Sequence, residues 1–290
     1  LQPIEQAGVH SGDSACSIPP YDISKDAINK IEIEVEKVIS NMKIIGLVNV
    51  QLAYVINKVY ILEVNPRASR TIPFVSKALG VPLARVAAKV MAGKSLKDLK
   101  FQNVPNLEGF FVKEAVMPFS KFQNVDPILG PEMRSTGEVM GIGNSFAEAF
   151  EKAEVGAGIE IPKKGSVFIS VRDTDKQFLS EIVPSLVEED FNLIATKGTA
   201  SVIKNMGFKV SQIKKVIEGR PNIVDLMKNK EVNLVINTTE GRESILDSAS
   251  IRRTALDEKI CCTTTIKGAK AICEVITKKV DWSYRKLQDI

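Results

Sequence analysis

The sequence has 290 residues, of which 44% are hydrophobic and 26% are charged, and its formal net charge is +4 at pH 7. These values are typical of a globular protein with one or two domains. No apolar run approaches the roughly 18 residues of a membrane span, so we expect no membrane partner. The surplus positive charge lies in residues 159–290. It is too small for binding a nucleic acid polymer but suits a small phosphorylated ligand.

The cysteines limit the metal chemistry that the chain can support. They form no C-x-x-C pair, and there is one histidine, so a zinc site is not expected. An adjacent pair with two scattered thiols is typical of reduced cysteines, and we expect a cytoplasmic protein. The four are Cys16, Cys261, Cys262 and Cys273.

The first segments predict a polar loop followed by a helix. Residues 6–20 are mostly small and polar, and His10 and Ser11 stand before a Gly-Asp turn dipeptide. A lone histidine is more often structural than functional. Its place in a Gly/Ser loop, rather than on an apolar face, favours contact with a polar ligand. Residues 24–42 carry apolar side chains at helical spacing, with Ser24 as the N-cap.

A β-hairpin with polar side chains follows the helix. Glu63 and Asn65 lie two residues apart on the second strand and therefore share a face. A carboxylate and an amide oxygen together suit a hard cation such as Mg²⁺. Arg67 and Arg70 come directly after them, and arginine suits phosphate oxygens. The alternative is an edge strand whose polar side chains face water. The two expected strands are residues 47–55 and 59–65.

The register of this hairpin decides whether a third ligand joins the pair. A three-residue loop, 56–58, places Gln51 opposite Glu63, and directly opposite residues share a face. A two-residue turn would place Gln51 opposite Val64 instead. Only the first register gathers Gln51, Glu63 and Asn65 around one point, and we predict that register.

The next segments predict mixed structure and then a linker. They are a helix at 74–92 interrupted at Gly80, a strand at 108–118 that contains Glu114, a long loop at 124–136, a short helix at 145–156 and a linker at 157–164.

The remaining residues alternate apolar strands with helices, which predicts a parallel sheet covered on both faces. The expected strands are 166–171, 191–196, 209–213, 232–238 and 260–265, and the expected helices are 174–189 with Pro184 inside it, 200–206, 223–229, 244–257 and a last one from about Lys267.

Two strand ends in this region have the chemistry of a phosphate site. Residues 196–199 read TKGT and open a helix, and residues 237–242 read NTTEGR after the next long strand. Hydroxyls, a glycine and free backbone N–H groups at a helix start suit an anion, and ligands of such sheets bind at the carboxyl ends of the strands. Either loop alone could be an ordinary turn. The two together favour a phosphate-bearing ligand, and no P-loop or G-x-G-x-x-G motif is present.

The sequence also contains four long motifs: EQAGVHSGDSACS (5–17), GLVNVQ (46–51), LEVNPRASRTIPFVSKALGVPLARVAAKVMAGKSL (62–96) and DPILGPEMRSTGEVMG (126–141). They resemble the carboxy-terminal half of the large chain of carbamoyl phosphate synthetase. The resemblance covers essentially the whole chain. It implies an α/β protein in which a partial ATP-grasp domain of α+β type (1–92) and the remainder of that catalytic unit (93–158) precede a doubly wound, methylglyoxal-synthase-like allosteric domain (159–290).

The resemblance also implies roles for individual residues. Gly8, Val9, His10 and Ser11 match an ATP-contacting loop, and Gln51 and Glu63 join them. Gln51, Glu63 and Asn65 match ligands of Mg²⁺ or Mn²⁺, with K⁺ as a further candidate ion. Arg67, Glu63 and Asn65 match the catalytic group. The nucleoside monophosphate effector site is matched by Lys176, Thr196, Thr199, Lys215, Asn237 and Thr239. An ornithine site of some members is matched by Glu5, Asp13, Glu114 and Thr264.

The implied reaction is phosphoryl transfer from ATP to carbamate, giving carbamoyl phosphate for pyrimidine and arginine biosynthesis. The chain lacks the first part of the ATP-grasp fold and the half that makes carbamate. We therefore expect no activity from the chain alone. We expect it to be a piece of a longer polypeptide, or to pair with separate segments, with a glutaminase small subunit as a further partner. Two alternatives are a non-catalytic effector-binding module and a different ATP-grasp ligase. The Gln51, Glu63 and Asn65 set argues against the first, and the 126–141 motif argues against the second.

Overall fold

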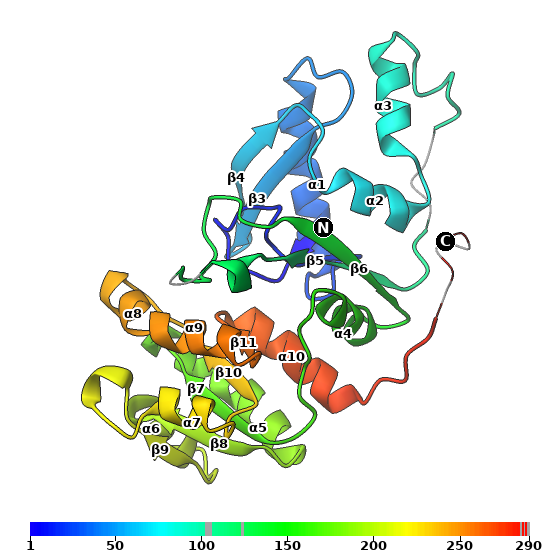
Figure 1. Ribbon diagram of the computed structural model, residues 1–290. Coiled ribbons are helices and arrows are strands. Elements are labelled where there is room, and N and C mark those ends of the chain that lie inside the picture. Colours follow the sequence, from blue (N-terminus) through cyan, green and yellow to red (C-terminus); the bar gives the residue numbers. More distant parts are fainter. Residues whose placement is uncertain (102–105, 123–124, 285, 287, 289–290) are drawn as a thin grey trace.

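The computed structural model describes residues 1–101, 106–122, 125–284, 286 and 288. Two sheets form the body of the molecule, and a separate hairpin extends from it (Figure 1). None of the helices in the described ranges is both long and apolar enough to cross a membrane. All four cysteines lie in the described part of the chain and are free thiols.

The first sheet is antiparallel and has the order β1-β2-β5-β6. Phe111 and Val112 alternate across it, as expected for a strand that is buried on both faces. Val112 belongs to the same apolar cluster as Phe146 of α4, and Phe111 to the same cluster as Phe74 of α2. The elements are β1 (Gln2–Pro3), β2 (Cys16–Ile18), α2 (Ile72–Leu79), α3 (Leu83–Met91), β5 (Phe110–Val116), η1 (Phe119–Lys121), β6 (Gly137–Gly143) and α4 (Phe146–Gly156).

Several sequence-based boundaries in this part were wrong. Strand β2 lies inside residues 6–20, which we expected to be a loop. The predicted interruption of the 74–92 helix at Gly80, whose φ of 63° is left-handed, is confirmed, but the first helix begins two residues earlier than predicted, at Ile72. Strand β6 was not predicted, because its glycine-rich sequence GEVMGIG reads as a loop.

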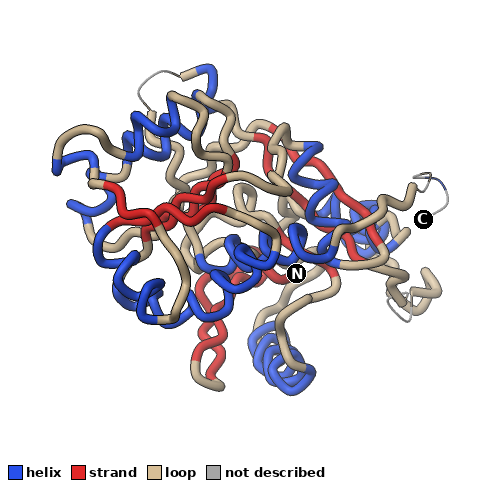
Figure 2. The backbone as a smooth tube through the Cα atoms, turned by 90° about the horizontal axis from the view of Figure 1, so that it is seen from below, coloured by secondary structure: helices blue, strands red, loops and turns tan. Residues whose placement is uncertain are grey.

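The hairpin is formed by β3 (Asn49–Val55) and β4 (Lys58–Asn65), and α1 (Lys25–Ser40) lies beside it. Ser24 caps α1 as predicted, since its side chain accepts a hydrogen bond from the amide of Ala27. Figure 2 shows the hairpin and α1 extending away from the body.

The predicted pairing of the hairpin is confirmed, but the predicted three-residue loop was wrong. Val55 pairs with Lys58, so the turn has two residues, Ile56 and Asn57, with φ of 47° and 62°. Positive φ at both positions is the signature of a tight hairpin turn. A register shift between Gln51 and Leu52 then restores the pairing of Gln51 with Glu63. The bulge therefore places Gln51 opposite Glu63, the pairing that we had expected a three-residue loop to produce.

The second sheet is parallel throughout and has the order β11-β10-β7-β8-β9, which confirms the predicted doubly wound fold class. Val167 and Ile169 of β7 face the cluster that contains α5 and α10, and Phe168 faces α7 and α9. The strands are β7 (Ser166–Ser170), β8 (Asn192–Thr196), β9 (Ser211–Ile213), β10 (Leu234–Asn237) and β11 (Cys261–Thr263).

Helices between these strands follow the prediction with two differences. The expected helix 174–189 begins as a 3₁₀ turn, and the expected helix 244–257 is divided at Ser248 into two. The helices are η2 (Asp173–Phe178), α5 (Leu179–Glu188), α6 (Lys197–Asn205), η3 (Val216–Glu218), α7 (Ile223–Lys228), α8 (Arg242–Asp247), α9 (Ala249–Asp257) and α10 (Ile266–Lys278).

The chain after α10 returns to α4 in the first part. The backbone N–H and the hydroxyl of Ser283 both donate to Glu148 Oε1 at 2.6 Å, and Trp282 Nε1 donates to Glu151 Oε2 at 2.9 Å. Burial of Glu148 opposes its ionisation. Hydrogen bonds from Lys152, Ser283 and Asn144 outweigh that effect and hold its pKa at about 2. One apolar cluster also contains side chains from both sheets. The domain boundaries given above therefore stay predictions.

Candidate functional site

The hairpin presents the predicted metal-binding side chains on one face. Gln51 pairs directly with Glu63, and Asn49 pairs with Asn65. Glu63 is exposed, and Gln51 and Asn65 are half-buried. Among the described residues, no three or more His, Cys, Asp or Glu side chains are grouped to hold a metal. One carboxylate with two amides therefore suits a hard cation whose remaining ligands come from phosphate and water.

The predicted ATP-contacting loop lies next to the hairpin. Gln51 Nε2 donates to the carbonyl of Val9 at 3.4 Å, which leaves the amide oxygen of Gln51 as its acceptor group. His10 Nδ1 accepts from the amide of Gly12 at 3.1 Å. In the neutral imidazole the proton is then on Nε2, so His10 can donate a hydrogen bond from that atom.

The two arginines after β4 take different positions. Arg67 is exposed, and its guanidinium donates to the adjacent Ala68 carbonyl at 3.1 Å. Arg70 instead donates to the Ser135 carbonyl and hydroxyl, each at 3.3 Å. Arg67 is thus the one that stays at the hairpin end, and Arg70 ties the following loop to residues 133–135.

A lysine that the sequence analysis did not identify holds the predicted ATP-contacting loop. Lys113 is fully buried in β5, and its ammonium donates to the carbonyls of Ser11 at 3.3 Å and Gly12 at 3.1 Å. Glu138 Oε1 lies 3.8 Å from the same ammonium. The only signal in the sequence is a charged pair, Lys113-Glu114, inside an otherwise apolar strand.

In the second sheet, the two predicted phosphate loops are joined at the carboxyl end of the central strand. Strand β7 lies between β8 and β10, so its end borders both loops. Ser170 and Thr196 share a hydrogen bond of 3.1 Å between their hydroxyls, and Thr199 Oγ1 accepts from the amide of Val171 at 3.2 Å. On the other side, Thr238 accepts from the amide of Arg172 at 3.1 Å. The sequence analysis had not singled out Thr238.

One buried polar group at this edge has no partner in the described structure. Asn237 is 1% exposed, and its side-chain Nδ2 is buried without a hydrogen-bond partner among the described residues. An unsatisfied buried donor costs about 1–3 kcal/mol, so an acceptor from a ligand would be favourable here.

The predicted lysines border the same loops. Lys176 Nζ lies 3.2 Å from the position that a Cβ on Gly198 would take, and it pairs with Asp173 at 2.7 Å. The hydrogen bond from Lys176, with charge from Lys176 and Lys215, lowers the pKa of Asp173. Lys176 therefore lies near the start of α6, and Lys215 lies close enough to Asp173 for its charge to act on that carboxylate. Thr196 is the N-cap residue of α6, but its side chain makes no capping hydrogen bond to the helix. Thr239 follows β10 and is half-buried.

The structure gathers two of the predicted ornithine residues into an acidic cluster and adds a third carboxyl group. Burial, and next the charge of Glu114, raise the pKa of Glu5 well above its usual range. Burial raises the pKa of Glu114 to about 7. The sequence analysis missed Glu154 of α4. Burial and the charges of Glu114 and Glu5 raise the pKa of Glu154 well above its usual range. Glu5 Oε2 has no hydrogen-bond partner within the described residues.

The other two predicted ornithine residues are placed differently. Asp13 is fully buried, and its carboxylate accepts from the amides of Arg134 at 2.6 Å and Ser135 at 3.0 Å. It therefore holds a loop of the protein. Thr264 directly follows β11.

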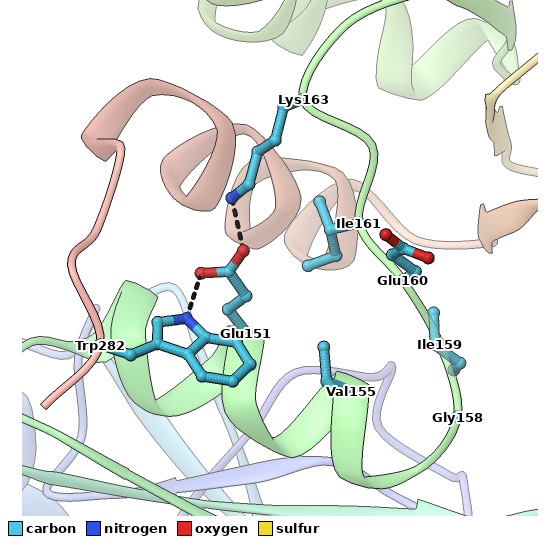
Figure 3. Close-up of a pocket in the computed structure, with 8 residues that line it drawn as sticks. All are labelled: Glu151, Val155, Gly158, Ile159, Glu160, Ile161, Lys163 and Trp282. Atoms are coloured by element: carbon cyan, nitrogen blue, oxygen red, sulfur yellow. Dashed lines mark hydrogen bonds and ion pairs between the residues drawn. The ribbon is translucent and has the colours of Figure 1, made fainter. Parts of the chain in front are cut away.

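A pocket of about 470 Å³ lies away from these residues, between α4, the linker and the C-terminal segment. Figure 3 shows Glu151 between Lys163 and Trp282, which contact its two carboxylate oxygens at 2.5 and 2.9 Å. Both oxygens of this carboxylate are thus engaged by the protein. The pocket contains none of the residues that sequence reasoning selected.

The comparisons with known proteins match both parts of the chain. The family model described as "Carbamoyl-phosphate synthase L chain, ATP binding domain" matches residues 3–99, and the model described as "MGS-like domain" matches residues 179–264. The chain is therefore similar to an ATP-binding domain over residues 3–99 and to an MGS-like domain over residues 179–264.

Relatives match the whole chain. The large chains of carbamoyl phosphate synthase from Pseudomonas putida, Pseudomonas aeruginosa and Pseudomonas syringae pv. tomato are 56%, 55% and 54% identical to it. Each match covers 100% of this chain and 27% of the relative. In sequence, the chain corresponds to the carboxy-terminal part of carbamoyl phosphate synthase large chains, and it spans about a quarter of their length.

Proposed function

We propose that the chain is the carboxy-terminal part of a glutamine-hydrolysing carbamoyl phosphate synthase, in which the hairpin site helps to transfer phosphate from ATP to carbamate. The pairing of Gln51 with Glu63, with Asn65 on the same face, carries this proposal. Mg²⁺ or Mn²⁺ at these oxygens would neutralise charge on the phosphates. Arg67 would contribute a fixed positive charge beside them, and His10 a hydrogen bond from Nε2.

The site is open and needs further segments to enclose ATP. The hairpin exposes apolar side chains, including Tyr60 and Leu62 at 50% each and Ile56 in the turn at 89%. Large exposed apolar side chains gathered on one element are typical of an interaction surface. We propose that the remaining segments of the large chain cover it and that a glutaminase small subunit supplies ammonia. The chain alone is then inactive.

An assay with these partners tests the catalytic proposal. With the missing segments and the small subunit supplied, we expect ATP-dependent formation of carbamoyl phosphate, and Glu63→Gln should lower its rate at least tenfold, because the carboxylate charge that binds the cation is lost. Glu36→Gln, at an exposed position of α1, is the matched control. An unchanged rate with Glu63→Gln would overturn the assignment of the metal site.

We also propose that the edge of the parallel sheet binds a nucleoside monophosphate effector. The unpartnered Nδ2 of Asn237, with Lys176 beside the start of α6, supports this ligand class, and Lys215 adds positive charge near Asp173. The acidic cluster of Glu5, Glu114 and Glu154 in the first part suits a cationic amine such as ornithine, since an ammonium would relieve the repulsion among the carboxyl groups.

Calorimetric titration of the chain with UMP, IMP and Mg-ATP, each separately, tests the effector proposal. We expect one nucleoside monophosphate to bind saturably and Lys215→Ala to weaken its binding about tenfold, because one cation facing the phosphate is removed. Lys204→Ala, at the far end of α6, should leave binding unchanged. Absence of binding by both monophosphates would exclude the effector site. Tight binding of Mg-ATP would show that the chain needs no further segments for ATP.

The alternative is a regulatory module without a catalytic site. One observation favours this alternative: the predicted effector residues Thr196, Thr199 and Asn237 lie at one edge of the second sheet. The assay with Glu63→Gln separates the two, because a module without catalysis would add no hairpin-dependent activity to its partners.

A further inference from the structure

One loop of the first part, residues 125–135, connects the two candidate sites; we name it the junction loop. It contacts the second part through Arg252 of α9, whose side chain is almost completely buried. Arg252 Nε donates to Asp126 Oδ1 at 2.8 Å, and the guanidinium also donates to Asp126 Oδ2. The pair is therefore bidentate, the arrangement in which arginine fixes both distance and orientation.

The same arginine also binds the helix that follows the effector edge. Arg252 donates to the carbonyl of Ile245 in α8 at 2.7 Å. Helix α8 begins at Arg242, directly after the loop that carries Asn237 and Thr239. A ligand that moves this loop therefore also acts on a carbonyl that Arg252 holds.

At its other end, the junction loop supports the ATP-contacting loop. The Asp126 carbonyl accepts from the Arg134 guanidinium at 3.1 Å, and the amides of Arg134 and Ser135 hold the Asp13 carboxylate. The carbonyl of Gly130 accepts from the amide of His10 at 2.8 Å. Arg70, just beyond the hairpin, is bound by Ser135.

We propose that the Arg252–Asp126 ion pair positions the junction loop and, through it, the His10 loop and Arg70, so that the effector edge and the phosphate site are coupled through this one pair. The inference rests on the proposed functions of the two sites. Its physical basis is that the Arg252 guanidinium is buried while the Asp126 carboxylate is 27% exposed, so withdrawal of the carboxylate leaves a buried charge without its counter-ion and favours the formed or the broken pair over intermediate states. Such a pair can transmit a small displacement of α8 as a discrete change in the junction loop.

The neighbouring arginine provides a matched control. Arg253 lies on the same helix and also crosses to the first part, but it donates to the carbonyls of Phe119 at 3.3 Å and Phe122 at 2.7 Å. These residues precede the junction loop. Removal of Arg253 therefore weakens the contact between the two parts without touching the proposed connection.

Amide hydrogen exchange of the full chain, followed by mass spectrometry, tests the positioning role without a ligand. The double variant Arg252→Met with Asp126→Asn removes both charges, so that neither is left unpaired. We expect exchange at residues 8–13 and 126–135 to rise at least tenfold, and Arg253→Met to leave residues 8–13 unchanged. A rise confined to α8, α9 and residues 119–122 would overturn the inference. If the double variant does not fold, Arg252→Lys, which keeps the charge but loses the fork, should give a smaller rise at residues 8–13.

A second arm uses UMP and IMP, each separately, as probes. In the unmodified chain, the nucleotide that binds should change exchange at residues 8–13. In the double variant it should still bind, with affinity within about threefold, but without that distant change. A distant change that persists in the double variant would show that another route carries the coupling. If neither nucleotide binds, the effector proposal fails, while the first arm still decides whether the ion pair positions the loop.

Discussion

Replacing Gly141 by alanine is expected to lower the free energy of unfolding by at least about 3 kcal/mol. An added Cβ would lie 1.9 Å from the carbonyl oxygen of Ala149 and 2.6 Å from the amide of Ala153, both in the backbone of α4. Backbone atoms cannot move aside as a flexible side chain does, so β6 and α4 must separate. Because α4 carries Glu148 and Glu154, the attachment of the C-terminal segment and the acidic cluster should both be disturbed.

The control is Gly137→Ala in the same strand. A Cβ there would meet Val116 at 3.8 Å, an ordinary van der Waals distance. Chemical denaturation of both variants, with the same slope against denaturant, measures the difference. Equal stability of the two variants would show that the strand and the helix are not packed as closely as the structure has them.

The second large effect concerns pH. Burial raises the pKa of Glu114 from a usual 4.5 to about 7, so between these values the folded state holds a proton that the unfolded state has lost. Stability is therefore fully present below pH 4.5 and falls as pH rises to 7, by about 3 kcal/mol for this group alone. Glu5 and Glu154 shift in the same direction. Thermal unfolding between pH 4.5 and 8 measures the slope.

Two variants separate this effect from general acid sensitivity. Glu114→Gln should raise the unfolding temperature at pH 8 and flatten the slope, because no charge has to be buried. Glu148→Gln should instead lower the unfolding temperature at neutral pH. Its pKa of about 2 means that ionised Glu148 stabilises the fold above pH 4.5 and loses that contribution only as pH falls towards 2. A Glu114→Gln variant with an unchanged slope would place the titrating group elsewhere.

Sequence patterns predicted the sites that depend on neighbours along the chain. The alternation of strands and helices in the second part fixed the parallel sheet, and the carboxyl ends of such strands meet at one edge. The hairpin pairing of Gln51 with Glu63 was predicted from the requirement that the ligands share a face. The turn was missed because Ile56, a β-branched residue, is a rare choice at positive φ, and a bulge leaves no clear signal in one sequence.

Features that depend on distant partners could not be predicted in this way. Strand β6 has little strand propensity of its own. Its glycines Gly141 and Gly143 are explained only by the backbone of α4, which lies too close for a Cβ at either position. Lys113 is buried because the carbonyls of Ser11 and Gly12 face it across 101 or more residues of sequence. The pairing of Arg252 with Asp126 likewise joins residues 126 apart. Nothing in the local pattern around either residue indicates its partner.

The return of the C-terminal segment to α4 limits how the second part can move. The chain enters the second part after the end of α4, at Gly156. It returns to the first turn of the same helix after α10, where Ser283 donates hydrogen bonds to Glu148. Two attachments about 12 Å apart along one helix define a line. Helix α10 also packs against α4, and Arg252 binds Asp126, so the second part is held along a whole side of α4 and not at a single hinge. Cutting the chain after residue 278 would remove the attachment at Glu148, and we expect the second part to rock more freely against α4.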